Sequence, residues 1–268
     1  MSISRRSFLA TCPVAVLPLV AGVPPPAGSA ATPEAPAPVG AGFPTQEPDL
    51  VREMVGVSHG NVARVKELVG RHATLAKAAW DWGFGDWESA LGAASHVGNR
   101  EIAEFLLANG ARPSIFSAAM LGQLEVVKAF VAALPGVQKT KGPHSIPLLK
   151  HALAGGPSAQ AVAEYLVALG GADEKPAEQS LSAEDIAKLA GSYSFGREAT
   201  DRIEVRLEKD RLMFARTGRQ ARGLFHLGSF EFCPVGAENV RIRFRDDATG
   251  LTLAVHDPDV VLSARKVL

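Results

Sequence analysis

Residues 91–111 read LGAASHVGNREIAEFLLANGA and decide the fold of the first half of the chain. The small residues at the start of this stretch let one helix approach its neighbours closely, and Gly98 favours a left-handed cap that ends this helix. Ile102, Phe105 and Leu106 then recur at spacings of three and four, which places them on one face of a second helix. A single helix pair cannot bury that face, so the sequence predicts stacked copies of the pair.

Two further copies follow at residues 115–131 and 148–172, and a degenerate copy opens the array around Gly60. The shared order of leucine, small pair, glycine, Glu-Ile or Glu-Val, Leu-Leu and Gly-Ala resembles the ankyrin repeat. The resemblance implies an ankyrin-type α-helical stack over residues 49–175, an architecture whose usual use is to bind other proteins.

The copies depart from a uniform period. The glycines expected to end the first helix of each copy in a left-handed cap are Gly60, Gly98, Gly122 and Gly155, which lie 38, 24 and 33 residues apart. The spacing of 24 residues, from Gly98 to Gly122, leaves no room for a projecting β-turn between the second and third copies of the array, counting the degenerate copy as the first. The contact surface of a standard ankyrin protein is therefore not carried over to this chain.

The three tryptophans of the chain all fall in the stretch WDWGFGDW at residues 80–87. Tryptophan is enriched at the centres of protein interfaces, and the flanking acids would select a basic partner. Two other interpretations stay open: the rings stack on a sugar or small ligand, or they cap the open end of the helical stack. The candidate partner-binding residues are Trp80, Trp82, Phe84, Trp87, Asp81 and Asp86.

After the repeats, apolar residues alternate with charged residues at 202–208 and again at 240–245, with turn signals between the runs. This pattern predicts six to eight short antiparallel strands that form a small barrel or sandwich over residues 189–268. A connecting helix is expected at 176–188, with Ser182 as its N-cap.

Three strings in this part, LAGSY at 189–193, FEF at 230–232 and LSARK at 262–266, resemble the small β domain found behind serine β-lactamase-like hydrolases. The resemblance implies an accessory domain without a catalytic centre of its own. Arg241, Arg243 and Arg245 alternate along one predicted strand and are candidate anion-binding residues, with a solvated strand face as the other interpretation.

The N-terminus combines Arg5 and Arg6 with an apolar run at 8–23 and a small-residue region, and it resembles a twin-arginine (Tat) signal peptide over residues 1–31. A lipid-attached Cys12 is the alternative. Two prolines interrupt the run, which argues against a spanning helix. Residues 32–48 are rich in proline and alanine, which predicts a disordered linker. We therefore expect a periplasmic or other extracytoplasmic protein, without stable membrane insertion after cleavage.

Composition and motifs narrow the function further. The 268 residues carry 28 Lys and Arg against 28 Asp and Glu, so no net charge attracts nucleic acid or an anionic membrane. The sequence contains no Gly-x-Ser-x-Gly elbow, no His-Glu-x-x-His, no phosphate loop and no dinucleotide fingerprint. His144 and His151 are the one suggestive histidine pair, but Pro147 between them argues against a shared helix face. We accordingly expect no metal and no cofactor.

These observations predict an exported, non-catalytic adaptor that uses an ankyrin-type stack to bind another protein of the cell envelope, an inference by analogy from fold to function. Two alternatives stay open. A carrier of a small apolar ligand would show a sizeable pocket between the strands of the β domain. An unrecognised hydrolase would show histidine and carboxylate groups clustered in one cleft.

Overall fold

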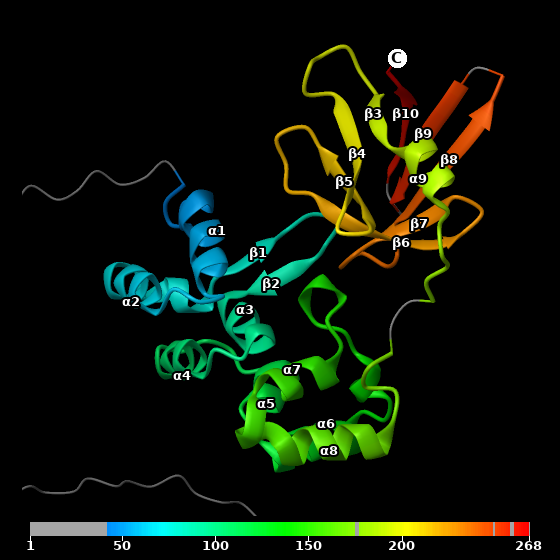
Figure 1. Ribbon diagram of the computed structural model, residues 1–268. Helices are drawn as coiled ribbons and strands as arrows, with labels where there is room; N and C mark the ends of the chain where they lie inside the picture. The colour runs from blue at the N-terminus through cyan, green and yellow to red at the C-terminus, as the bar shows by residue number, and fades with distance from the viewer. Residues whose placement is uncertain (1–41, 175–176, 249, 258–259, 268) are drawn as a thin grey trace, which may run out of the picture. The chain divides into compact units, whose positions relative to one another are not determined.

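Paired helices form the first part of the chain in the computed structural model, which describes residues 42–174, 177–248, 250–257 and 260–267 (Figure 1). The first helix of each pair packs against the first helix of the next pair. The predicted signal peptide lies outside the described residues. The pairs are α1 (Pro48–Val57) with α2 (Val62–Arg71), α3 (Ala90–Val97) with α4 (Arg100–Ala108), α5 (Ile115–Met120) with α6 (Leu124–Ala133), and α7 (Leu148–Ala154) with α8 (Gln160–Leu169).

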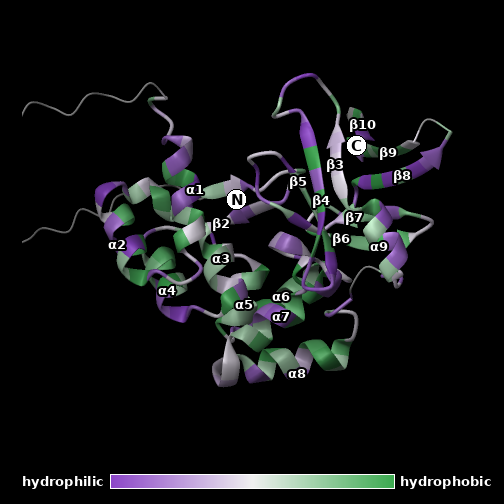
Figure 2. Cartoon of the chain, turned by 45° about the horizontal axis from the view of Figure 1, so that its top comes forward, coloured by the Kyte–Doolittle hydropathy of each residue, from purple (hydrophilic) through white to green (hydrophobic). Residues whose placement is uncertain are grey.

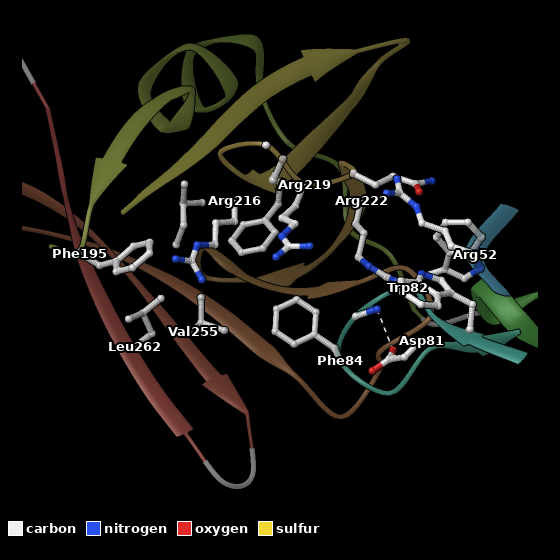
Figure 3. A pocket seen from close by; sticks show the side chains of 17 residues that line it. Arg52, Asp81, Trp82, Phe84, Phe195, Arg216, Arg219, Arg222, Val255 and Leu262 are labelled. Carbon is white, nitrogen blue, oxygen red and sulfur yellow. Dashed lines mark hydrogen bonds between the residues drawn. The ribbon is translucent and has the colours of Figure 1, made fainter. Parts of the chain in front are cut away.

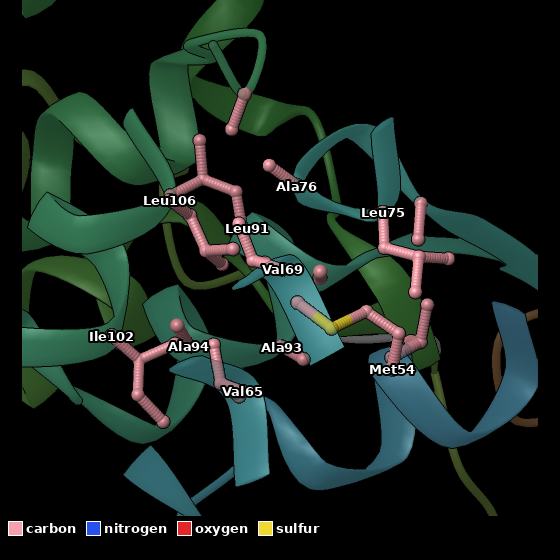
Figure 4. Close-up of a cluster of buried hydrophobic side chains, with 14 of the residues drawn as sticks. Met54, Val65, Val69, Leu75, Ala76, Leu91, Ala93, Ala94, Ile102 and Leu106 are labelled. Atoms are coloured by element: carbon pink, nitrogen blue, oxygen red, sulfur yellow. The ribbon is translucent and has the colours of Figure 1, made fainter. Parts of the chain in front are cut away.

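Small residues and apolar stripes build the helical core as the sequence predicts. Ala93, Ala94, Ala118 and Ala119 are all buried, so the first helices of neighbouring pairs lie close together. Figure 4 shows Ile102 and Leu106 of α4 among the buried side chains of α1, α2 and α3. Burial of this shared surface is what stabilises helices that are too short to be stable alone.

The glycine prediction is confirmed at two positions and wrong at two. Gly98 and Gly122 adopt φ of 77° and 76°, the left-handed conformation expected of a cap. Gly155 has φ of −68° and so keeps a right-handed helical conformation, because the chain continues directly into a 3₁₀ turn, η4 (Gly156–Ala159). Gly60 is not a cap either, because α1 ends at Val57 and Ser58 is its C-cap.

A short hairpin that is absent from the predicted elements precedes α3. It follows a 3₁₀ turn, η1 (Ala73–Lys77), and consists of β1 (Ala79–Asp81) and β2 (Trp87–Ser89). Trp80 pairs with Glu88 across the two strands. By contrast, residues 109–114 between α4 and α5 contain no strand, as the spacing of 24 residues predicted.

The C-terminal part is a closed eight-stranded antiparallel barrel in the order β10-β3-β4-β5-β6-β7-β8-β9. Of the two predicted architectures, the barrel is therefore observed. Ser182 caps the preceding helix α9 (Ala183–Leu189) as predicted, since its hydroxyl accepts from the Asp185 amide. The strands are β3 (Gly191–Ser194), β4 (Arg202–Glu208), β5 (Arg211–Arg216), β6 (Arg222–Gly228), β7 (Glu231–Pro234), β8 (Arg241–Asp247), β9 (Gly250–Asp257) and β10 (Val260–Lys266).

Inward-facing side chains, which alternate with outward-facing ones along most of the strands, form the barrel core. Figure 2 shows hydrophobic and hydrophilic residues alternating along β4, where Ile203 and Val205 point inward. Leu207 breaks the predicted pattern and is half exposed, because it lies beside the β4–β5 turn and beyond the core.

Residues Ala41–Leu268 form one unit, within which specific bonds join the helical part to the barrel. Asp86 in the hairpin accepts from Arg222 Nη1 at 2.9 Å. Ser145, in the 3₁₀ turn η3 (Pro143–Ser145), accepts from the Gly236 amide at 2.7 Å. The hairpin β1–β2 and the turn η3 thus lie where the two parts meet.

Candidate metal centre

Four side chains with metal-binding atoms converge beneath the hairpin. They come from four separate elements: His59 from the turn after α1, Glu88 from β2, His96 from the last turn of α3 and His144 from η3. Their nearest ligand atoms all lie within 4.8 Å of one another. The site is therefore assembled by tertiary packing and has no local sequence motif.

Strand alternation places Glu88 inside. Successive residues of a strand point to opposite faces, so Trp87 is 63% exposed whereas Glu88 is fully buried. Trp82 Nε1 donates to Glu88 Oε2 at 2.8 Å, which fixes one carboxylate oxygen. The other oxygen, Oε1, faces His59 and His96.

Three of the four ligand atoms lie at distances that suit a tetrahedral ion. Glu88 Oε1 lies 2.9 Å from His96 Nε2 and 3.6 Å from His59 Nε2, and these two nitrogens are 3.1 Å apart. Zinc bound to imidazole and carboxylate at about 2.0–2.1 Å places neighbouring ligands about 3.3 Å apart in a tetrahedron. His144 Nε2 completes the set at 3.4 Å from Glu88 Oε2.

Further hydrogen bonds orient two of the imidazoles. The Nδ1 of His59 lies 2.9 Å from the carbonyl oxygen of Gly56 and donates to it. The Nδ1 of His144 donates to Asp86 Oδ2 at 2.8 Å. Both contacts fix the proton on Nδ1 and leave Nε2 free to bind an ion, which is the usual arrangement around metal-ligating histidines.

Asp86 also holds the backbone that carries His144. His144 and Ser145 both have φ of 58°, an unusual left-handed conformation for residues with a side chain. Asp86 Oδ1 accepts from the His144 amide at 2.9 Å, while Oδ2 accepts from the His144 ring and from Arg222. The buried Asp86 carboxylate therefore positions this ligand and compensates the strained turn.

The electrostatics of the ion-free site reflect this crowding of charge. Burial alone would lower the pKa of His144, but hydrogen bonds to Asp86 and Glu88 outweigh it and raise the pKa to about 9. Burial alone would raise the pKa of Glu88, but hydrogen bonds from His144 and His96 lower it to about 2. Without an ion, the His144 imidazolium lies between the two buried carboxylates and, together with Arg222 at Asp86, balances their charge.

The predicted histidine pair divides between two environments. His144 belongs to the cluster, whereas His151 on α7 is fully buried with both ring nitrogens lacking a hydrogen-bond partner among the described residues. Its ring packs against Phe116 at 4.8 Å between centroids. Burial, aided by the charge of His96, lowers the pKa of His151 to about 3, so this ring is neutral.

The predicted partner-binding residues take several roles. Trp80 and Trp82 are partly buried against the helical core, and Phe84 packs against the barrel core. Asp81 accepts from the Gly83 amide at 2.7 Å. Of the acids expected to select a basic partner, Asp86 and Glu88 are buried and already paired, and Trp87 is the exposed tryptophan.

The predicted anion-binding arginines lie along β8. Arg241 and Arg243 both pair with Glu231, and Arg245 is exposed.

Ser263 and Lys266 have the Ser-x-x-Lys spacing of a serine acyl-enzyme. They lie in strand β10, where residues three apart point to opposite faces. That spacing places a lysine beside a serine only in a helix.

No protein-family model matches the chain, and the search of curated proteins finds no relative. Among the described residues, none of the helices has the length and apolar character needed to cross a membrane. The site therefore has to be interpreted from its own geometry.

Proposed function

We propose that this protein binds a divalent first-row transition metal ion, with Zn²⁺ as the best fit, through His59, Glu88, His96 and His144. The carrying observation is the convergence of three imidazole Nε2 atoms on one buried carboxylate, whose oxygens lie 2.9, 3.4 and 3.6 Å from His96, His144 and His59. Imidazole favours zinc, copper, iron and nickel, and an ion would replace the His144 proton as the positive charge between Glu88 and Asp86.

Four protein ligands close a tetrahedral shell, which is characteristic of structural zinc, because catalytic zinc keeps a position open for water. The ion would tie together the end of α1, the hairpin, α3 and the turn η3. The cluster is also the feature that an unrecognised hydrolase would require, but the closed shell favours a structural ion.

The direct test is zinc binding by the chelator-treated full chain, measured by competition with a chromophoric chelator. We expect one equivalent to bind, and His96→Ala or Glu88→Gln to weaken binding at least about 100-fold. His72→Ala is the matched control, because His72 is an exposed histidine outside the cluster. Failure of the unmodified chain to bind zinc, or an equal loss in the control, would overturn the proposal.

A second candidate function is the exported adaptor. We propose that residues 49–175 are an ankyrin-type stack that binds another protein, and the stacked helix pairs support this. A shallow groove of about 630 Å³ at the α7–α8 end is lined by Leu153 and Val167, which are 53% and 64% exposed. An exposed apolar groove of this kind fits an apolar segment of a partner protein.

The adaptor proposal is tested with a purified binding partner obtained by affinity capture. Leu153→Ser together with Val167→Ser should abolish binding if the groove is the contact, whereas Trp87→Ala should abolish it if the hairpin is. Unchanged affinity in both variants, with helicity retained, would exclude both surfaces.

Export by the Tat route is also part of this proposal, and it rests on the sequence of residues 1–31. Changing Arg5 and Arg6 to lysine should leave the uncleaved precursor in the cytoplasm. Cleaved protein in the periplasmic fraction of that variant would refute it.

A further inference from the structure

A cavity of about 510 Å³ lies between the hairpin β1–β2 and the barrel, outside the metal-ligating cluster (Figure 3). Its size is that of pockets that bind drug-sized ligands. Five aromatic side chains supply much of its wall: Trp80, Trp82, Phe84, Phe195 and Phe214. Such a wall favours a flat apolar ligand, because stacked and edge-to-face contacts between aromatic rings stabilise the complex.

The hairpin tip is shaped to form this wall. Phe84 has φ of 55° between two glycines that also have positive φ, Gly83 and Gly85. This turn brings the Phe84 ring to 6.2 Å from the ring of Phe214 in the barrel. The cavity therefore combines residues from both parts of the chain.

The charged lining of the cavity is mainly basic. Arg216 and Arg222 have acidic partners, Asp201 and Asp86, that do not line the cavity. Arg52 and Arg219 also line it, and within the described residues no carboxylate lies within ion-pair distance of either. Asp81 is the one acidic residue that lines the cavity among the described residues, so the arginine charges of the lining exceed the carboxylate charge.

We propose that this cavity binds an aromatic organic anion, with its ring system among Phe84, Phe195 and Phe214 and its acidic group at Arg52 and Arg219. An aromatic body matches the rings, and a carboxylate, sulfonate or phosphate matches the unpaired guanidinium groups. None of the four residues of the metal-ligating cluster lines this cavity.

The test compares two fluorescent probes that differ by one group, 1-anilinonaphthalene-8-sulfonate and the uncharged N-phenyl-1-naphthylamine. The full chain should bind one sulfonate probe at least about tenfold more tightly than the neutral probe. Arg219→Gln and Arg52→Gln should each weaken the sulfonate probe about fivefold and leave the neutral probe unchanged, as expected for a partly exposed ion pair. Arg112→Gln, at an exposed arginine outside the cavity, should change neither.

Two further variants test the apolar wall of the cavity and its separation from the metal-ligating cluster. Phe195→Ala should weaken both probes, because it removes part of the shared apolar wall. His96→Ala should retain sulfonate binding, so that failure of the metal site and failure of this cavity are distinguishable. Equal affinity for the two probes, equal loss in Arg112→Gln, or non-saturable binding would overturn the proposal.

Discussion

The affinity for zinc should rise steeply with pH, because one ligand must lose a proton to bind. His144 has a pKa of about 9 in the ion-free protein, raised by Asp86 and Glu88 against the effect of burial. Asp86 holds the proton on Nδ1, so the proton that leaves is the one on Nε2. Zinc then occupies that nitrogen.

The expected magnitude follows from the pKa. At pH 7, two units below a pKa of about 9, about 1% of His144 is deprotonated, which weakens apparent binding about 100-fold, or about 2.7 kcal/mol. Affinity should therefore increase about ninefold from pH 7 to pH 8 and level off above pH 9. About one proton should be released for each zinc bound at pH 7.

Calorimetry in two buffers with different ionisation enthalpies measures this release, and chelator competition between pH 6.5 and 8.5 measures the slope. Asp86→Asn should lower the pKa of His144, flatten the slope above pH 7 and weaken binding at pH 9 about 10- to 100-fold. An affinity that does not change between pH 7 and pH 8.5, or no proton release at pH 7, would refute this reasoning.

Three further predictions concern stability, measured by denaturant unfolding of the full chain. Gly122→Ala should lower the free energy of unfolding by more than about 3 kcal/mol, because the new Cβ would lie 2.0 Å from the Ser158 carbonyl oxygen. Gly136→Ala, also at positive φ but with open space around it, should lower it by about 1–2 kcal/mol. Equal losses in the two variants would contradict the proposed clash. His151→Leu should stabilise the fold by about 1–2 kcal/mol at pH 7, because it removes two buried ring nitrogens without a hydrogen-bond partner among the described residues. The gain should grow as the pH falls below 6.5, because the folded protein keeps His151 neutral whereas the unfolded chain binds a proton there. A loss of stability would indicate a hydrogen-bond partner of His151. Tyr193→Phe should cost about 1 kcal/mol, because the buried hydroxyl donates to a backbone carbonyl at 2.6 Å, and an unchanged unfolding midpoint would show that this bond contributes nothing.

Local chemistry explains why much of the fold could be predicted. Helix pairs follow from spacings of three and four, as at Ile102 and Leu106, and barrel strands follow from alternation, as at Ile203 and Val205. The cap at Gly155 failed because the close approach of the Met120 carbonyl, and not a left-handed turn, requires glycine there. That contact depends on a neighbouring helix and leaves no local signal.

The metal centre could not be predicted because its ligands are spread over residues 59–144 on four elements. Two signals existed. His96 lies in α3, a helix whose other residues are mostly small and buried, so an imidazole there had to meet a neighbour. The stretch WDWGFGDW carries Gly-Phe-Gly between two runs of Trp and Asp, which indicates a hairpin turn that would have placed Glu88 and Trp82 near each other. Neither signal identifies the second and third histidines.

The hairpin β1–β2 links the metal centre to the barrel. Glu88 faces the ion site, Asp86 bonds both His144 and Arg222 of the barrel, and Phe84 reaches the barrel core. Without the barrel, the Asp86 carboxylate would lose its Arg222 partner, and the turn that carries His144 would lose the bond from the Gly236 amide to Ser145. The helical part alone therefore lacks these two supports for His144, and we expect the proposed zinc binding to require the barrel as well.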